Sequence, residues 1–412
     1  MCGVRHRICC AVGYELPAGH KFNYPAFLRE DNHMAERIKV MQIIARMNVG
    51  GPAVIVAELM RGLDESKFEQ ILITGYCDET EADYLDEVAT DIKATRIAGL
   101  GRSVSPIADL KAFFGLVRTI KTLKPDVIHT HTAKAGVLGR MASIIAGRGA
   151  VRIHTFHGHL LHGYFASWKT KIIVIIEKFF ASRTHFLIAV GNEARKDLVA
   201  AGIGKADQYS VFFPGLPQPH TASKSEIRKN LELDPTAIYC TFVGRLTQIK
   251  RPDRLLDVAA AMVKREVDIH FLIAGEGELF ESSKARAIAE GLSVTFLGWR
   301  KDIDDLFAAS DIAILTSDNE GIPLTLIQAA QAGLPIVAPA VGSISDIVEN
   351  DKTGFLTSPQ PGAMASALSA LATDAELRNR LGIAGKARAD EFFSLDRMLR
   401  DHTEIYNRTH NK

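Results

Sequence analysis

The most constraining feature of this sequence is an alternation of short apolar segments with longer helical patterns, which runs through the chain twice. The short segments are rich in Ile and Val and apolar on both sides, as parallel strands covered by helices on both faces must be. A chain of 412 residues is too long for one ordinary core and suits two domains. The sequence therefore predicts an α/β protein with two Rossmann-like parallel-sheet domains.

The strands expected in the first half are Lys39–Ile44, Gln70–Thr74, Thr95–Ala98, Asp126–Thr130, Val151–Phe156, His185–Val190 and Tyr209–Phe213. Those expected in the second half are Ile238–Val243, Ile269–Ala274, Val294–Leu297, Ile312–Leu315 and Pro335–Ala338. Helices are expected at Ile107–Leu123, Ala133–Ile145, Pro252–Lys264, Leu279–Glu290, Ile303–Ala308, Ile322–Ala332, Gly362–Ala372, Ala375–Asp390 and Leu395–Tyr406. Because open parallel sheets bind ligands beyond the carboxyl ends of their strands, the chemistry is expected at these ends.

Five parts are expected along the chain. Residues 1–37 have no periodic pattern, and we interpret them as a disordered leader or as a start assigned upstream of Met34. The remaining parts are an N-terminal domain over 38–214, a proline-rich linker over 215–235, a C-terminal domain over 236–394 and a last helix over 395–412. This last helix is expected to pack back on the N-terminal domain.

Composition excludes several classes of protein. The formal net charge is +1, which does not indicate a nucleic-acid partner. The five cysteines are odd in number and contain no C-x-x-C, so neither a disulfide framework nor a zinc site is expected. No apolar run reaches the roughly 18 residues of a membrane span, and no signal-peptide pattern precedes the first strand. A cytoplasmic protein is expected.

The charge is unevenly distributed. Seven acidic residues and no basic one lie between Tyr76 and Asp91, whereas fifteen Lys or Arg oppose three acids between Lys93 and Arg183. The basic stretch is either a solvated face or a surface that faces anionic lipid or an anionic substrate. Within it, residues 164–183 combine aromatic and basic side chains with an Ile-rich centre. They read as a packed helix or as an amphipathic helix that touches a membrane.

Several strand ends carry residues suited to phosphate. Gly50 and Gly51 follow the first strand and precede a helix, whose free N–H groups can bind phosphate. In the second half, Gly244 is followed by Arg245 and, five residues later, by Lys250. Arg can bind two phosphate oxygens at once and Lys acts as a point charge, so a phosphate group is the expected ligand, with solvated loop charges as the alternative.

A third loop presents a carboxylate at a strand end. Glu320 precedes Gly321 and Ile322, where a helix is expected to begin, and Gln328 follows on that helix. Eight helical residues rise about 12 Å, which is the length scale of a nucleotide sugar. Glu320 and the backbone amides beside it are therefore expected to hold one part of such a ligand, and Gln328 another.

Two glycine motifs fall short of a dinucleotide fingerprint. Gly275-Glu276-Gly277 is followed by Phe280 where a third glycine is required, and Gly99-Leu-Gly101 also lacks the third glycine. A nicotinamide or flavin oxidoreductase is therefore disfavoured.

Histidines gather at two neighbouring strand ends. His157 and His159 follow one strand, with His162 beyond them, and His129 and His131 end the strand before it, spaced to lie on one face. No carboxylate completes a metal-binding set, so no metal is expected. From the sequence alone, His157 is a histidine packed at a strand end or one that serves acceptor binding.

From Ile38 to the C-terminus the chain resembles the retaining glycosyltransferases of family 4, which have the GT-B fold. The densest matches are Gly50-Gly51, Val243-Gly-Arg-Leu246 with Lys250, Ala274-Gly-Glu-Gly277, Glu320-Gly-Ile-Pro323 with Ala332-Gly-Leu-Pro335, and a glycine loop at Thr353-Gly-Phe-Leu356. The resemblance implies two Rossmann-like domains facing across a cleft, with the acceptor side in the N-terminal domain and nucleotide-sugar binding in the C-terminal domain.

The resemblance also implies roles for particular residues. Arg245 and Lys250 would neutralise the donor diphosphate, and Gly50-Gly51 would lie against it. Glu320 with nearby backbone amides would hold sugar hydroxyls, and His157 would lie close to the transferred sugar. Gly244, Gly275, Glu276, Gly321, Ile322 and Gln328 complete the expected donor site.

Four features depart from the family pattern. Gln328 replaces a Glu that binds ribose hydroxyls, so charge assistance would be missing there. Gly342-Ser343 with Asp346 replaces a glycine pair followed by Glu, which leaves sugar selectivity open. Pro214-Gly215-Leu216 replaces the Asn-Gly linker, and the histidine near the donor must be chosen among several.

The expected function is therefore transfer of a hexose from a nucleoside-diphosphate sugar to a glycan or lipid-linked acceptor with retention, in bacterial cell-surface polysaccharide synthesis. No cofactor or metal is expected besides the donor itself, nor a nucleic-acid partner. The site would lie in the cytoplasm, peripheral to the inner face of an anionic membrane. A sugar-nucleotide 2-epimerase of similar fold and a catalytically weak sugar-nucleotide-binding protein remain as alternatives. The nucleobase, sugar, acceptor, linkage and oligomeric state stay open.

Overall fold

The computed structural model describes residues 36–79, 81–147, 149–158 and 167–410. Nearly all of the expected leader lies outside this range, as do His159 and His162. None of the helices in the described ranges is long and apolar enough to cross a bilayer.

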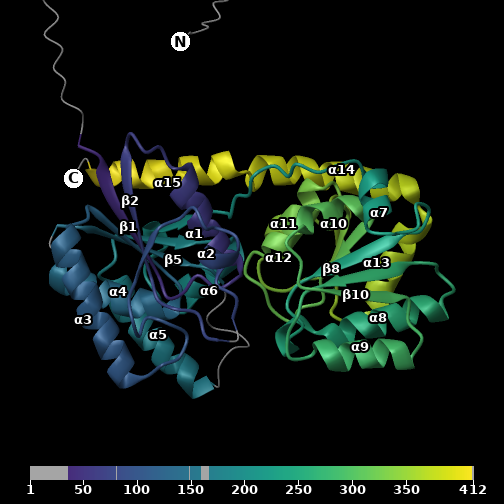
Figure 1. The fold of residues 1–412 in the computed structure, drawn as a ribbon, viewed down its shortest axis with the longest axis horizontal. Helices are drawn as coiled ribbons and strands as arrows, with labels where there is room; N and C mark the ends of the chain where they lie inside the picture. Colours follow the sequence, from purple (N-terminus) through teal and green to yellow (C-terminus); the bar gives the residue numbers. More distant parts are fainter. Residues whose placement is uncertain (1–35, 80, 148, 159–166, 411–412) are drawn as a thin grey trace, which may run out of the picture. The chain divides into compact units, whose positions relative to one another are not determined.

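The first half of the described chain is a seven-stranded parallel sheet in the order β3-β2-β1-β4-β5-β6-β7 (Figure 1). Its strands are β1 (Ile38–Ile44), β2 (Phe68–Thr74), β3 (Ala94–Arg96), β4 (Val127–His131), β5 (Val151–Phe156), β6 (Phe186–Ala189) and β7 (Tyr209–Val211). The helices of this half are α1 (Gly51–Gly62), α2 (Tyr84–Glu87), α3 (Pro106–Leu123), α4 (Ala133–Ala146), α5 (Ser167–Ala181) and α6 (Asn192–Ala200).

The second half is a six-stranded parallel sheet in the order β10-β9-β8-β11-β12-β13. Its strands are β8 (Tyr239–Val243), β9 (His270–Ala274), β10 (Val294–Gly298), β11 (Ile312–Ile314), β12 (Ile336–Pro339) and β13 (Gly354–Thr357). Its helices are α7 (Lys224–Asn230), α8 (Pro252–Lys264), α9 (Phe280–Ala289), α10 (Ile303–Ala309), α11 (Leu324–Gln331), α12 (Ile344–Ile347), α13 (Pro361–Thr373) and α14 (Ala375–Phe392), and α15 (Leu395–His410) ends the chain. The expected pair of parallel-sheet domains is confirmed.

The structure refines three local expectations, and the first of them is wrong. Thr353-Gly-Phe-Leu356 is not a glycine loop, because Gly354 opens the edge strand β13. A Cβ there would lie 2.2 Å from the carbonyl oxygen of Ile336, so the glycine serves close strand pairing. The linker expected over 215–235 contains helix α7, which begins at Lys224 and whose N-cap Ser223 accepts from the backbone N–H of Glu226. Helix α11 begins at Leu324, after its N-cap Pro323, which is two residues beyond the expected start at Ile322.

The strand order reverses once in each sheet, at β1/β4 and at β8/β11. Strand β1 pairs with β2 on one side and β4 on the other, and β8 pairs in the same way with β9 and β11. Connections leaving these strands go in opposite directions, which opens a crevice beyond the carboxyl ends. The loops that follow β1, β4, β8 and β11 therefore border these two crevices, and they contain most of the residues singled out from the sequence.

The last helix returns to the first half. The backbone N–H of Leu395 donates to the carbonyl of Leu216 and that of Leu216 donates to Phe393, so the returning chain runs beside the linker. From there α15 buries Met398, Ile405 and Tyr406 in a core with residues of β1, α1 and β2. The Tyr406 ring meets Phe68 edge to face at 5.9 Å between centroids. The N-terminal core is thus completed by the end of the chain.

A buried ion pair explains why Glu177 interrupts the apolar centre of α5. Arg140 of α4 donates to Glu177 of α5 over 2.7 Å, and both side chains are almost fully buried. The Arg140 Nε also donates to the carbonyl of Gly136. Glu177 therefore points into the domain, whereas Ile172, Ile175, Ile176 and Phe179 of the same helix are exposed. Only one side of α5 belongs to the core.

Candidate functional site

The loops after β8 and β11 bring Lys250 and Glu320 into contact. The Lys250 Nζ donates to Glu320 Oε1 over 2.5 Å, and the Ser317 hydroxyl donates to the same oxygen over 2.5 Å. The two side chains are 21% and 11% exposed, so the pair is partly accessible to solvent and does not lie in the core. An incoming anion can therefore reach the ammonium while the carboxylate keeps its hydroxyl donor.

The same two loops are held together around Asp318. Arg254 donates to an oxygen of Asp318 over 2.6 Å and also to the carbonyl of Thr316, and Arg251 donates to Asp318 at 3.2 Å. The Thr316 hydroxyl donates to the carbonyl of Lys250 over 2.8 Å. These contacts order the backbone on both sides of Lys250 and Glu320, which preorganises the charged pair.

Arg245 differs from its neighbours because it is exposed, and its guanidinium has no ion-pair partner anywhere in the described ranges. It follows Gly244 directly after β8, at the same sheet edge as Lys250. A guanidinium that no described carboxylate binds is available for an external anion. Two cations therefore lie at one strand end, and of these two Lys250 alone has an ion-pair partner among the described residues.

Close backbone contacts explain the glycines on this side of the site. A Cβ at Gly275, where φ is +134°, would lie 2.0 Å from the carbonyl oxygen of Gly244. A Cβ at Gly342, where φ is +53°, would lie 1.9 Å from the carbonyl oxygen of Glu320. These glycines let neighbouring loops approach closely. Gly342 thus sets the position of the Glu320 backbone.

Gly50 and Gly51 behave differently. A Cβ on either would meet no described atom closer than 3.6 Å, which is the distance from Gly51 to the Leu324 side chain. Gly50 caps α1 with extended backbone, and Pro52 stands in its first turn. Nothing within the described chain requires glycine at these positions. The missing side chains leave room beside the N-terminal N–H groups of α1.

The loop after β5 contacts the loop that carries Glu320. A Cβ at Gly321 would lie 2.8 Å from the carbonyl oxygen of His157 and 3.0 Å from Gly158 Cα. His157 therefore reaches the charged loops of the second half through backbone contact. The structure brings Lys250, Glu320, Gly321 and His157 into one neighbourhood.

Two other expected ligand residues have protein partners. Ile322 is buried in the second core, so only its backbone can face a ligand. Gln328 of α11 donates its amide to Asp304 of α10 over 2.9 Å, and burial raises the pKa of that carboxyl group. The sequence analysis missed Asp304, which puts a carboxylate next to the position where the family pattern has Glu. Glu276 is exposed, and its carboxylate accepts from the backbone of Trp299 at 3.4 Å.

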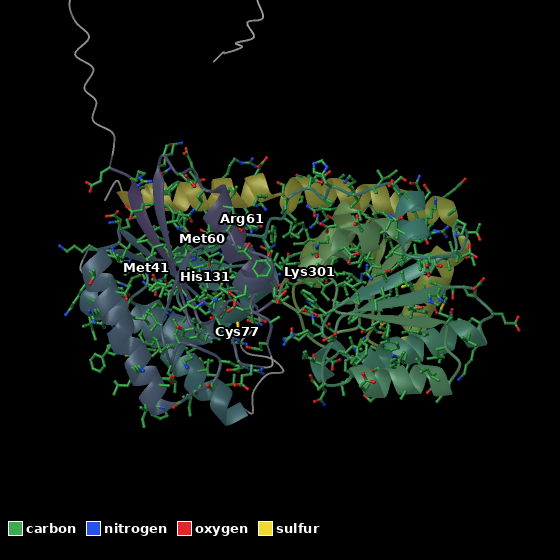
Figure 2. The ribbon with its side chains drawn as sticks, in the orientation of Figure 1. Met41, Met60, Arg61, Cys77, His131 and Lys301 are labelled. Carbon is green, nitrogen blue, oxygen red and sulfur yellow. The ribbon has the colours of Figure 1, made fainter. Side chains whose placement is uncertain are left out.

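Among the histidines at the ends of β4 and β5, His129, His131 and His154 are buried and His157 is partly buried. His131, labelled in Figure 2, lies with its ring 4.1 Å from that of His129 and 5.2 Å from that of His157, centroid to centroid. Burial lowers the pKa of His129, His131 and His154 well below the usual range and that of His157 to about 3. The Nδ1 atom of His157 is buried with no hydrogen-bond partner among the described residues.

No group of three or more His, Cys, Asp or Glu is placed to hold a metal ion in the described part of the chain. The histidine cluster is completed by Gln42, Thr155 and Tyr406, which are hydrogen-bonding side chains without charge. The sequence predicts that Gln42 is buried, because it lies in an apolar strand. It does not predict that Gln42, Thr155 and Tyr406 contact the histidines. The cations Arg245 and Lys250 at the end of β8 suit an anionic ligand, whereas the neutral polar side chains at the ends of β4 and β5 are buried against one another.

Family models match both halves of the chain. The model described as "Glycosyl transferase 4-like domain" matches residues 50–215, and the model described as "Glycosyl transferases group 1" matches residues 223–388. The first match contains Gly50, Gly51 and His157, and the second contains Arg245, Lys250, Glu320 and Gln328.

Named relatives are glycosyltransferases too. An Escherichia coli protein named UDP-Gal:alpha-D-GlcNAc-diphosphoundecaprenol alpha-1,3-galactosyltransferase is 32% identical over 303 residues, which are 70% of this chain and 76% of that protein. A D-inositol 3-phosphate glycosyltransferase of Salinispora tropica is 26% identical over 397 residues, 87% of this chain and 81% of the other.

Solved structures share the fold. The Anabaena protein HepE, solved with UDP and glucose, has a TM-score of 0.77 at 21% identity and covers 90% of this chain and 100% of its own. Sucrose-phosphate synthase of Thermosynechococcus elongatus has a TM-score of 0.78 at 19% identity and covers 91% and 100%. Both family models match, and the structure has the two parallel-sheet domains that these relatives share. The chain therefore belongs to the group 1 glycosyltransferases of the GT-B fold.

Proposed function

We propose that the protein transfers a hexose from a uridine diphosphate sugar to a hydroxyl of a lipid-linked glycan, with retention of the anomeric configuration. The observation that carries the proposal is the meeting of Lys250, Glu320 and His157 at strand ends of the two halves. The E. coli relative is named for a UDP-galactose donor and a diphosphoundecaprenol-linked acceptor, and HepE was solved with UDP. These names support the choice of donor and acceptor.

The charges fit departure of a diphosphate. When the anomeric C–O bond breaks, negative charge develops on the diphosphate and positive charge on the sugar. Arg245 and Lys250 would stabilise the diphosphate, and Gly50-Gly51 would offer N–H groups to the same oxygens. Glu320 would hold sugar hydroxyls from its place beside Lys250. Protein cations then replace a metal ion, and no metal is needed.

In this proposal the anomeric configuration is retained because the acceptor hydroxyl loses its proton on the face from which the diphosphate departs. Double displacement needs a carboxylate nucleophile and a second carboxyl group about 5 Å from it. Glu320 is already bound to Lys250 and Ser317, which lowers its availability as a nucleophile. We infer that the leaving phosphate oxygen takes the proton of the acceptor hydroxyl on the same face of the sugar. The new glycosidic bond then forms on the side from which the diphosphate departs.

Ligand-induced stabilisation tests the donor class. We expect UDP to raise the unfolding midpoint, whereas GDP, ADP, CMP and NAD leave it unchanged. A ligand at 100 times its Kd adds about 2.7 kcal/mol, or roughly 2–4 °C for a chain of this size. A shift with NAD alone would contradict the proposal and restore the oxidoreductase hypothesis. Incubation with UDP-sugars and a polyprenyl-diphosphate-linked acceptor, followed by NMR of the product, then gives the anomeric configuration.

The same incubation separates the alternatives. An epimerase would change the donor sugar without any acceptor, and a binding protein would show the UDP shift without turnover. Transfer that depends on the acceptor and keeps the donor configuration supports the proposal. The contact between Gln328 and Asp304 favours an active donor site over a weak binder, because a carboxylate remains beside the position that lost one.

We propose further that the outer faces of α3 and α5 contact an anionic membrane. Both helices expose an apolar stripe, comprising Ile107, Leu110 and Phe114 on α3 and Ile172, Ile175, Ile176 and Phe179 on α5. Exposed basic residues flank the stripes, namely Lys111, Arg118, Lys121, Lys171, Lys178 and Arg183. This combination is typical of helices that lie in a membrane surface. The protein would then bind a lipid-linked acceptor at the membrane surface that holds the lipid.

Vesicle flotation tests the membrane proposal. Vesicles with anionic lipid should carry the protein upward and neutral vesicles should not. The double variant Ile175→Ser/Phe179→Ser should lose this binding, and Ile288→Ser/Ile383→Ser is a matched control because these exposed apolar residues lie on α9 and α14. Equal binding to both vesicle types, or to none, would contradict the proposal.

A further inference from the structure

A continuous chain of buried hydrogen bonds connects His157 with the last helix. His157 Nε2 lies 2.9 Å from His131 Nδ1, and His131 Nε2 lies 2.8 Å from Gln42 Oε1. The Gln42 Nε2 donates to the hydroxyl of Tyr406 over 3.0 Å. Tyr406 belongs to α15, so the final turns of the protein are coupled to the strand end at which His157 sits.

The chain continues beyond Tyr406. The Tyr406 hydroxyl lies 2.7 Å from His129 Nδ1, and His129 Nε2 lies 2.7 Å from the Thr155 hydroxyl. Gln42, His129, His131 and Tyr406 are all fully buried. No water molecule is needed in this series of hydrogen bonds, because each of them joins two side chains directly.

The orientation of Gln42 determines the direction of every hydrogen bond on the His157 side. Its amide nitrogen donates to Tyr406, so its oxygen faces His131 and can only accept. His131 must therefore carry its proton on Nε2, which leaves Nδ1 as an acceptor. His157 must then donate from Nε2 to His131, which leaves His157 Nδ1 without a proton.

The other direction from Tyr406 is consistent with this assignment. A hydroxyl that accepts from Gln42 still has one proton to donate, and His129 Nδ1 is within 2.7 Å of it. His129 then donates from Nε2 to Thr155. All three imidazoles are neutral, because burial lowers the pKa of each, in the case of His157 to about 3. Each has one donor nitrogen and one acceptor nitrogen, and all contacts are satisfied except one.

That exception is His157 Nδ1, which has no partner among the described residues. We propose that Tyr406 and Gln42 are positioning residues, which act through His131 to hold His157 in the Nε2–H tautomer with a bare Nδ1 as acceptor. This inference rests on the proposed function only in its last step, in which the free lone pair accepts a hydrogen bond from a hydroxyl of the bound substrate. The tautomer itself is a property of the protein alone.

The position of Tyr406 gives this arrangement a consequence for folding. Tyr406 reaches Gln42 only when α15 has packed against β1, since the two residues are 364 positions apart. An N-terminal domain without the last helix would lack the hydroxyl that orients the amide of Gln42. The amide could then turn over, and the tautomers of His131 and His157 would no longer be determined.

The tautomer can be measured on the unmodified protein. Full-length protein labelled with ¹⁵N in the histidine rings is recorded without ligand, and the His157→Asn variant identifies the His157 signals. We expect Nε2 of His157 in the range of protonated ring nitrogens and Nδ1 in the range of unprotonated ones. A protonated Nδ1 on His157 would overturn the proposal.

Removal of one hydroxyl tests the positioning role. In Tyr406→Phe we expect the His157 signals to move or split between tautomers, with kcat lowered on the order of tenfold and KM for the nucleotide sugar unchanged. Tyr209→Phe is the matched control, because Tyr209 is also buried and donates its single hydroxyl to the carbonyl of Ile203. Signals and kcat that respond equally in both variants would overturn the proposal.

The two readouts separate this proposal from the proposed function. If the labelled protein shows the expected tautomer and the expected response to Tyr406→Phe, but no sugar is transferred, the positioning role stands and the transferase proposal fails. If Tyr406→Phe does not fold, the spectrum of the unmodified protein still decides the tautomer.

Discussion

The two halves of the molecule line their strand ends with opposite chemistry. In the second half, Lys250 and Glu320 form an ion pair at a partly exposed edge. In the first half, His131 and Gln42 are buried and make only uncharged hydrogen bonds. A charge that must meet an anion gains from keeping some hydration until the ligand arrives, because burying an unpaired charge is expensive.

Under the proposed function, the two halves would bind different parts of the substrate. Cations suit the diphosphate, where charge develops during transfer, and they do not need a deep pocket to act. Neutral imidazole and amide groups tolerate burial because their hydrogen bonds satisfy one another, and His157 Nδ1 is the one buried ring nitrogen that has no hydrogen-bond partner among the described residues. If this division is right, changes in the second half should affect chemistry strongly, and changes in the first half should affect stability in acid.

The largest effect is expected from Lys250→Ala. This variant removes a cation from the diphosphate and leaves Glu320 without its partner, so kcat/KM should fall on the order of 10²–10³-fold. Arg286→Ala is the control, because Arg286 forms ion pairs of similar length on α9 with Asp257 and Glu290. Steady-state rates with a UDP-sugar measure both, and a loss below about fivefold in Lys250→Ala would contradict the division of roles.

The buried histidines predict strong acid sensitivity. Burial lowers the pKa of His157 to about 3 and of His402 to about 4, whereas the unfolded chain binds these protons near pH 6.5. Between these values the unfolded state holds more protons, so stability falls as pH falls, by about 1.4 kcal/mol per pH unit for each such group. Urea unfolding between pH 7 and pH 5 measures this slope.

A histidine variant sharpens that test. His402→Gln should make the slope shallower by about one proton. His220→Gln is the control, because His220 is exposed and should leave the slope unchanged. A stability that does not change between pH 7 and pH 5 would show that the cluster is not buried and neutral as the structure describes it.

A smaller effect is expected from Gly342→Ala. The added Cβ would lie 1.9 Å from the carbonyl of Glu320, so the loop must shift, at a cost of about 1–3 kcal/mol and with weaker UDP binding. Gly333→Ala is the matched control, because Gly333 also has a positive φ of 76° but open space around it. It should lose only about 1 kcal/mol and bind UDP normally, as measured by thermal unfolding and calorimetry. Equal UDP affinity in both variants would argue against a role of this loop.

The smallest effect is expected from Gln328→Glu. The new carboxylate would lie beside Asp304, which now accepts from the Gln328 amide, and repulsion should cost about 1 kcal/mol of stability above pH 7. The exchange variant Asp304→Asn/Gln328→Glu should recover that loss. Thermal unfolding at pH 8 compares the two variants. An unchanged midpoint in Gln328→Glu would show that the carboxylates at positions 304 and 328 do not repel each other.

Short-range pattern was enough to predict most of the fold. The strand segments beginning at Lys39, Val151 and Ile238 were found within two residues, because a segment buried on both faces must be apolar throughout. Strand β13 is not predicted, because a glycine at position 354 suggests a loop. The structure shows instead that the neighbouring carbonyl of Ile336 leaves no room for a side chain there. Such a requirement arises between strands and leaves no local pattern.

The sequence by itself determined the two parallel-sheet domains, the family and the set of strand ends at which Arg245, Lys250, Glu320 and His157 stand, because these follow from local periodicity and from motif spacing. Only the tertiary structure decided what each residue meets. It paired Lys250 with Glu320, put Asp304 beside Gln328 and brought Tyr406 to Gln42 across 364 positions. The physical reason is that periodicity records which side chains are buried, whereas a hydrogen bond depends on the packing of segments that are distant in the chain.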